Sequence, residues 1–325
     1  MRLPAEWESH SATWLCWPHN PETWPGALTE AEQEYGRFVE LLSESESVHV
    51  LVQSQEHREH VAPRVPAAVA LHEFETDDSW MRDTGPTFVE RDDASPLAID
   101  WTFNSWGGKY SPWDRDDATA AEVARLAGVE CRRPELVLEG GALESNGDGT
   151  LLLTRSSAVG DNRNAGLTQS DLETRLRELL GARRIVWIDG ALEGDDTDAH
   201  IDNLARFTPA GHVVCASEQN RDDPNFAALR QSARQLEEAG FEVMGIPLPP
   251  PRYAGAERLP ASHLNFYLAN DQLLIPGFGG ASDDVARGLL QEQFPKHRAA
   301  LLSCRALVRG LGTLHCLSQQ QPRAG

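Results

Sequence analysis

Four segments of the chain place a Cys, His, Asp or Glu beside glycine or at the edge of a β-rich run. They are DDSWMRDTGPTF (77–88), LEGGALESNGDGT (138–150), GDDTDAHIDNLARF (194–207) and GLGTLHCLSQQQP (310–322). Connections held by a rigid scaffold are where functional side chains concentrate. The last segment lies at the end of the chain, where residues are usually polar and frayed. Its apolar, glycine-bearing sequence therefore predicts a segment tied into the body of the fold.

The third and fourth segments offer a nucleophile and a base. If residues 200–202 are extended, His200 and Asp202 point to the same side, because side chains alternate along a strand. By the same rule, His315 and Cys316 point to opposite faces. This favours Cys316 as the nucleophile and His200 as the general acid/base, with His315 as a poor partner for the thiol. Taken alone, the His-Ile-Asp segment is equally consistent with a solvated strand edge.

Three carboxylates, Asp83, Glu139 and Asp202, accompany these groups. Anions raise the pKa of a thiol and repel the oxyanion of an acyl intermediate, so they disfavour a cysteine protease. A guanidinium suits such a site, because carboxylates hold its flat, charged fork with paired N–H···O bonds. The central carbon then stays open to a thiolate, which the cation also helps to ionise. The residues therefore predict chemistry on a guanidine or amidine.

Composition excludes several other classes of protein. The 325 residues include 50 acids and 29 Lys and Arg, which gives a net charge of −21. Such a surface repels nucleic acid and anionic membranes. The five cysteines are scattered and form no CxxC pair, which disfavours a disulfide framework and a thiolate zinc site. Since the sequence shows neither a secretory signal nor an apolar run of membrane-spanning length, we expect a cytoplasmic protein.

Hydrophobic periodicity indicates repeated α/β modules. Helical patterns cover 29–44, 115–127, 168–180, 224–239 and 282–294, and β-rich runs cover 47–53, 97–101, 150–154, 184–189, 212–216, 241–247 and 272–276. The last four helices start roughly 55 residues apart, near the long end of recurring structural units. No proline-rich or low-complexity linker divides the chain. We therefore expect about five βαβ-like modules in a single catalytic domain over residues 1–325.

Six motifs in order along the chain carry a resemblance to a known family. They are PAEWESHSATWLCWPHN (4–20), DSWMRDTGPTF (78–88), EGGALESNGDGT (139–150), TDAHIDNLARF (197–207), ASHLNFYLAN (261–270) and GLGTLHCLSQQQP (310–322). With them the chain resembles the agmatine deiminase and bacterial peptidylarginine deiminase family of the guanidino-group-modifying, or pentein, superfamily. The resemblance implies an α/β fold, a five-bladed pseudo-symmetric propeller of ββαβ-type modules, with the site at its axis.

The resemblance also assigns roles at the matching positions. Cys316 corresponds to the nucleophile, His200 to the acid/base, Asp83 and Asp202 to the carboxylates that grip the guanidinium, Glu139 to a residue that orients the histidine or holds substrate nitrogens, and Trp80 to an aromatic wall beside the aliphatic chain. The implied reaction is hydrolysis of a guanidine to a ureido group and ammonia through a covalent thiouronium intermediate. It implies no metal and no cofactor.

Substrate identity depends on positions outside the reacting groups. The chain has Leu311 and Thr313 where the family often has Gly and Asn, and His263 where it often has Tyr. The loop at 192–200 offers four acids and no base, which favours an amine over a carboxylate. Agmatine, converted to N-carbamoylputrescine, is therefore expected first and a peptidylarginine second. The sequence leaves three alternatives: an amidinotransferase, a binding protein on the same scaffold, and a metallohydrolase, which the absence of HExxH spacing disfavours. It also leaves open whether the protein forms a homo-oligomer.

Overall fold

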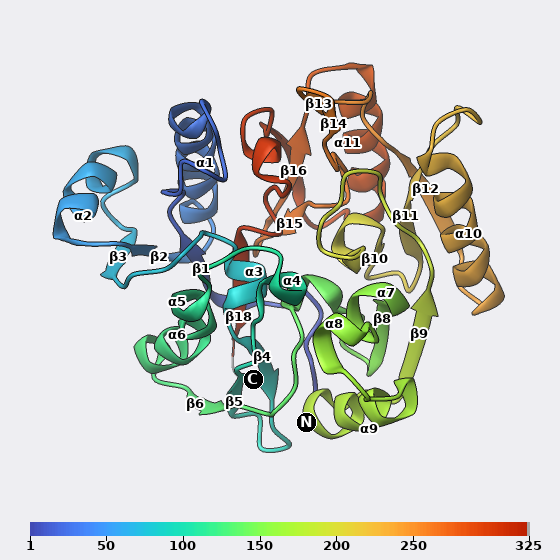
Figure 1. Ribbon diagram of the computed structural model, residues 1–325, viewed down its shortest axis with the longest axis horizontal. Coiled ribbons are helices and arrows are strands. Elements are labelled where there is room, and N and C mark those ends of the chain that lie inside the picture. The colour runs from blue at the N-terminus through green and yellow to red at the C-terminus, as the bar shows by residue number, and fades with distance from the viewer. Residues whose placement is uncertain (324–325) are drawn as a thin grey trace.

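A three-stranded unit recurs five times in the computed structural model of the chain, which describes residues 1–323 (Figure 1). The first unit combines β18 (Ser318–Pro322), β1 (His10–Cys16) and β2 (Ser47–Val52), with β3 (Ala70–Glu73) as a fourth strand. The others are β4 (Thr87–Glu90), β5 (Pro96–Ile99) and β6 (Glu130–Arg132); β7 (Glu144–Ser145), β8 (Thr150–Thr154) and β9 (Arg184–Ile188); β10 (Ala205–Phe207), β11 (Val213–Ser217) and β12 (Val243–Pro247); and β15 (Tyr267–Leu268), β16 (Gln272–Gly277) and β17 (Arg298–Ser303).

Each unit has the same strand directions. Its first strand is antiparallel to the second, and the second is parallel to the third. A parallel pair needs a long crossover, and a helix fills it in every unit: α1 (Leu28–Ser43), α6 (Thr119–Ala127), α9 (Gln169–Leu180), α10 (Asn225–Glu238) or α11 (Ala281–Gln293). In Figure 1 these helices lie around the outside, while β4, β10, β15 and β18 lie toward the middle. The five predicted modules and the α/β class are confirmed.

Shorter elements fill the connections between these units. They are α2 (Gln55–Val61), α3 (Met81–Thr84), α4 (Ser105–Gly108), α5 (Asp114–Asp117), α7 (Arg155–Ala158), α8 (Asp161–Asn164), the 3₁₀ turns η1 (Ala62–Arg64), η2 (Gly140–Ala142), η3 (Ile201–Asn203) and η4 (Leu307–Gly310), and the hairpin of β13 (Tyr253–Ala254) and β14 (Glu257–Arg258). None of the helices among the described residues is long and apolar enough to cross a membrane.

Local signals explain where the helices begin and end. Thr168 and Asp171 form the capping box predicted at the start of α9, and Gly181 ends that helix in the left-handed conformation. The single helix expected at 115–127 is wrong in detail, because the chain forms α5 and α6 as separate helices on either side of Ala118. The other four predicted helices match α1, α9, α10 and α11 within two residues at each end.

The C-terminal segment is part of the fold, as its sequence predicts. β18 pairs antiparallel with β1, so that Ser318 lies opposite Leu15 and Gln319 opposite Trp14. The last strand therefore completes the sheet of the first module and closes the ring of modules. Because the pairing begins at Ser318, two residues after Cys316, it helps to fix the backbone that carries the predicted nucleophile.

Candidate active site

Each module carries a polar side chain of the site in the two to five residues before its first strand. Asp83 precedes β4, Glu139 precedes β7, Asp202 precedes β10, Asn265 precedes β15 and Cys316 precedes β18. The contacts below bring all five together with His200, which also precedes β10. The five predicted residues Asp83, Glu139, His200, Asp202 and Cys316 are all buried, none more than 6% exposed. The repeat therefore positions one chemical group per module in a single site.

Asn265 is a member of the site that sequence reasoning missed. Its Oδ1 accepts hydrogen bonds from the backbone N–H groups of His315 (3.2 Å) and Cys316 (3.4 Å). Those two donors fix the orientation of the amide, so its Nδ2 donates to Cys316 Sγ at 3.0 Å and to Asp202 Oδ2 at 3.3 Å. Its place before the first strand of the fifth module is the signal that could have found it.

Cys316 lies in a strongly anionic environment. Its Sγ is 3.6 Å from Asp202 Oδ2. Burial raises the pKa of the thiol well above its usual range, and the carboxylates of Asp202 and Asp83 raise it further, while the bond from Asn265 lowers it. The carboxylates thus have the effect expected from the sequence. A cation placed between them and the sulfur would favour the thiolate.

His200 lies beside the predicted carboxylates, but the segment that follows it is a 3₁₀ turn and not the expected strand. It directly precedes the 3₁₀ turn η3, which contains Asp202, so residues 200–202 are not a strand and the argument from strand alternation is wrong. Its Nδ1 is 3.7 Å from Asp83 Oδ1 and its Nε2 is 3.7 Å from Glu139 Oε2. Burial lowers the pKa of the ring, but the three carboxylates of Asp83, Glu139 and Asp202 outweigh it and raise the pKa to about 9. The imidazolium is therefore the form present at neutral pH.

Asp83 and Glu139 are each held by a residue that the sequence did not single out. Asp83 accepts hydrogen bonds from Trp106 Nε1 at 3.0 Å and from the backbone N–H of Gly141 at 2.9 Å. Glu139 Oε1 accepts from Arg163 Nε at 2.6 Å, and both side chains are fully buried. Within residues 1–323, Glu139 Oε2 and both ring nitrogens of His200 are buried without a hydrogen-bond partner. Buried polar atoms are rarely left unpaired, so these three point to a ligand.

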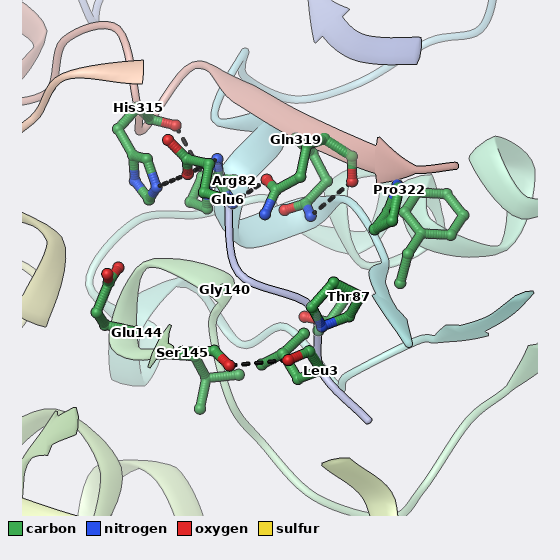
Figure 2. A pocket seen from close by; sticks show the side chains of 14 residues that line it. Leu3, Glu6, Arg82, Thr87, Gly140, Glu144, Ser145, His315, Gln319 and Pro322 are labelled. Carbon is green, nitrogen blue, oxygen red and sulfur yellow. Dashed lines mark hydrogen bonds and ion pairs between the residues drawn. The ribbon is translucent and has the colours of Figure 1, made fainter. Parts of the chain in front are cut away.

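His315 supports Asp202 rather than the thiol. Its Nδ1 lies 2.8 Å from Asp202 Oδ2 and its Nε2 lies 2.8 Å from Glu6 Oε2. Figure 2 shows the ring directed toward Glu6, with Arg82 beside it, at a cavity on this side of the site. Arg82 Nη2 is 3.4 Å from Glu6 Oε2, so these two buried side chains form an ion pair. Burial raises the pKa of Asp202, but its contact with His315 outweighs this and lowers it.

Two glycines let the reacting side chains approach the backbone. A Cβ at Gly312 would lie 2.5 Å from the Trp80 ring and 3.0 Å from Cys316 Cβ. Trp80 therefore covers the segment next to the nucleophile, where the predicted aromatic wall would stand. A Cβ at Gly141 would lie 2.5 Å from His200 Nδ1 and 2.8 Å from Asp83 Oδ1. Real Cβ atoms essentially never come this close, so both positions require glycine for space.

We expect Gly141→Ala to reduce kcat/KM by at least about tenfold, because the added methyl displaces His200 or Asp83 from the other. The measurement is a steady-state ureido-product assay together with thermal unfolding. Gly288→Ala is the matched control, since a Cβ there meets nothing within 4 Å and lies in α11. Activity of the Gly141 variant equal to that of the control would contradict this packing.

The titration of His200 provides a test of the electrostatics. Its pKa of about 9 lies above the usual 6.5, so the imidazolium stabilises the fold fully below pH 6.5, and this contribution is lost as the pH rises through 9. We expect NMR of the His200 Hε1 proton to show a midpoint near 9, and Asp83→Asn to lower it. His200→Gln assigns the signal. A midpoint at or below 6.5 in the unsubstituted protein would contradict the assignment.

The departures from the family pattern differ in their contact with the site. Thr313 Oγ1 donates to Asn265 Oδ1 at 2.7 Å, and Leu311 has a left-handed backbone with φ of 74°. His263 lies apart from the reacting groups: its Nδ1 is 2.7 Å from the Pro247 carbonyl and its Nε2 is 3.0 Å from Asp283 Oδ1. Thr313 is thus the departure with a direct contact to a residue of the site.

The acids of the 192–200 loop are less available than the sequence suggests. Asp198 lies 2.8 Å from Lys109 Nζ and 2.9 Å from Arg163 Nη1. Asp196 accepts a hydrogen bond from Tyr110 Oη at 2.6 Å. The loop itself contains no Lys or Arg, but the fold places Lys109 and Arg163 against it. The argument for an amine substrate from this loop alone is therefore weaker than expected.

Known proteins with the same motifs share the whole fold. The chain is 33% identical over 350 residues to the agmatine deiminase of Pseudomonas aeruginosa, with 99% of this chain and 95% of that protein covered. A substrate-bound agmatine deiminase of C. jejuni, a Cys-to-Ser variant, is similar with a TM-score of 0.94 and 29% identity, covering 99% of this chain and 96% of that chain. The agmatine deiminase of Enterococcus faecalis has a TM-score of 0.94 and 26% identity over 100% of this chain and 96% of its own. The Porphyromonas-type peptidyl-arginine deiminase family matches residues 2–322, and with motifs, modules and relatives in agreement, the chain belongs to this family.

Proposed function

We propose that the protein is an agmatine deiminase, which hydrolyses agmatine to N-carbamoylputrescine and ammonia. The observation that carries the proposal is the enclosed group of Asp83, Glu139 and Asp202 around a cysteine and a histidine. Three buried carboxylates suit a cationic, forked substrate and would repel an oxyanion. Curated relatives at 33% identity over nearly the full chain are agmatine deiminases, which supports this substrate over a general guanidine.

In the proposed first half-reaction, the Cys316 thiolate attacks the guanidine carbon. Asp83 and Asp202 accept N–H bonds from the guanidinium, and its positive charge offsets the carboxylates that raise the pKa of the thiol. Asn265 Nδ2, 3.0 Å from Sγ, stabilises the thiolate. His200 enters as an imidazolium and donates its proton to the departing nitrogen, which leaves as ammonia.

In the second half-reaction, His200 is neutral and can accept a proton from water. The hydroxide equivalent adds to the thiouronium carbon, and the C–S bond then breaks to give the ureido product. The Cys316 sulfur leaves as the thiolate, His200 keeps one proton of the water as the regenerated imidazolium, and the proton of the added hydroxyl passes to solvent, where it converts the released ammonia to ammonium. Glu139, held by Arg163 and facing His200 Nε2 at 3.7 Å, orients the ring between the two roles. Every step of this proposal uses side chains of the site and water.

A peptidylarginine is the second candidate substrate, because the matching family is described by that activity. Free arginine ranks third, although Lys109 and Arg163 partly neutralise the 192–200 loop and leave only a weak bias against its α-carboxylate. The test is a ureido-product assay with agmatine, a peptide with a terminal arginine and free arginine at equal concentration. We expect kcat/KM to be highest for agmatine, and a clear preference for either of the others would overturn the choice of substrate.

All five cysteines are free, which supports a reducing, cytoplasmic setting for the enzyme.

A further inference from the structure

A cleft of about 470 Å³ lies between the β13–β14 hairpin and the segment that carries η4. Its lining includes the chain from Pro250 to Gly255, Leu259, Arg305 and Arg309. The hairpin and α11 lie together at the top of Figure 1. A volume of this size is in the range of small-molecule sites. The residues of the proposed reaction do not line it.

The charge of the cleft is opposite to that of the whole protein. Arg252, Arg305 and Arg309 contribute three guanidinium groups, and no acid lines the cleft. Among residues 1–323, no carboxylate oxygen comes within 4.0 Å of any of the three as an ion pair, although the chain has 50 acids. Burial lowers the pKa of Arg252, and the nearby charge of Arg305 lowers it further. The carboxylates of Asp283 and Glu34 act in the opposite direction on the pKa of Arg252 but do not outweigh burial and Arg305, and neither makes a direct ion pair with it.

Two buried polar atoms beside the cleft also lack a partner. Within the described part of the chain, Arg252 Nε and Ser282 Oγ are buried and make no hydrogen bond. Ser282 lies in the first turn of the 13-residue helix α11, whose N-cap Gly280 has no side-chain bond. A Cβ on Gly280 would lie 3.8 Å from Pro250, so the start of this helix lies next to a residue of the cleft wall. Asp283 in the same turn is already bonded to the backbone N–H groups of Phe278 and Gly279.

Arg252 and Arg305 are close enough to share one ligand group. Both lie near the point where a Cβ on Gly279 would stand, Arg252 Nη2 at 3.8 Å and Arg305 Nη1 at 3.9 Å. The two nitrogens are therefore no farther apart than the sum of these distances, and one carboxylate or phosphate that accepts an N–H···O bond of about 2.8 Å on each side can bridge such a separation. We propose that the cleft binds a small oxyanion, carboxylate or phosphate, between Arg252 and Arg305, with Arg309 at the rim. Agmatine has no anionic group, so this site goes beyond the proposed function.

The experiment is isothermal titration of the purified protein with inorganic phosphate and, separately, with the tricarboxylate citrate, at constant ionic strength set with NaCl. We expect saturable binding of at least one probe. The tighter probe identifies the source of the oxyanion. The Arg252→Gln/Arg305→Gln double variant should bind at least tenfold more weakly. The charge-matched control is Arg175→Gln/Arg221→Gln, two exposed arginines elsewhere on the surface, and it should bind like the unsubstituted protein.

Three results would overturn the proposal. They are the absence of saturable binding of both probes, equal weakening in the control, and unchanged affinity in the double variant. If the double variant is unstable, the exposed Arg305→Gln variant alone carries the same test. Sedimentation of each variant adds a further check: a change in oligomer mass without anion binding would show that the cleft is an interface between copies of the chain.

Discussion

The Cys316→Ala variant is expected to lose agmatine turnover by at least about 10⁴-fold while keeping its fold, because only the attacking atom is removed. Cys316 is buried between Asn265 and Asp202, and loss of one sulfur there leaves the strand pairing of β18 intact. The measurement is a single-turnover ureido assay with circular dichroism of the same sample.

Cys131→Ala is the matched control, because that cysteine is free and exposed. It should retain full activity. Turnover by the Cys316 variant within tenfold of the control would mean that the reaction does not pass through this sulfur, whatever the fate of the other site residues.

The Asp83→Asn and Asp202→Asn variants should each bind agmatine more weakly by about 1.5–3 kcal/mol, more than tenfold. Each change keeps the size of the side chain but removes a charge that would face the guanidinium. The measurement is the dissociation constant of agmatine for each variant in a Cys316→Ala background, where no reaction obscures binding.

Asp148→Asn, in the exposed turn between β7 and β8, is the control for the loss of one negative charge. It should leave binding unchanged, because long-range attraction between exposed charges is screened by salt. If Asp83→Asn or Asp202→Asn stays within twofold of this control, that carboxylate does not grip the substrate.

The chemistry of the site could be predicted from the sequence because its reacting residues stand in recognisable segments. Cys316, His200 and the three carboxylates each lie in a glycine-bearing or acidic motif, and hydrophobic periodicity revealed the five modules that bring them together. The order of these motifs along the chain carried the resemblance to a family, and the resemblance then assigned a role to each residue.

The supporting residues could not be predicted in this way, because their roles depend on contacts between distant parts of the chain. Trp106 reaches Asp83 and Arg163 reaches Glu139 from loops of the same module, 23 and 24 residues away along the chain, and no local sequence pattern marks either contact. Asn265 lacks a reactive group and has meaning only as the fifth equivalent position. Likewise, the 3₁₀ turn after His200 reflects tertiary packing that overrides the strand pattern of its sequence.

The most direct test of the account is the intact mass of His200→Ala protein quenched after mixing with agmatine. His200 serves both half-reactions, but the departing nitrogen can take its proton from solvent, whereas no other base of the site activates water, so the intermediate should form slowly and then persist. We predict a mass increase equal to agmatine less ammonia, located on Cys316 by peptide mapping and absent from the His200→Ala/Cys316→Ala double variant. An increase that persists in the double variant, or that maps to another residue, would contradict covalent catalysis by Cys316.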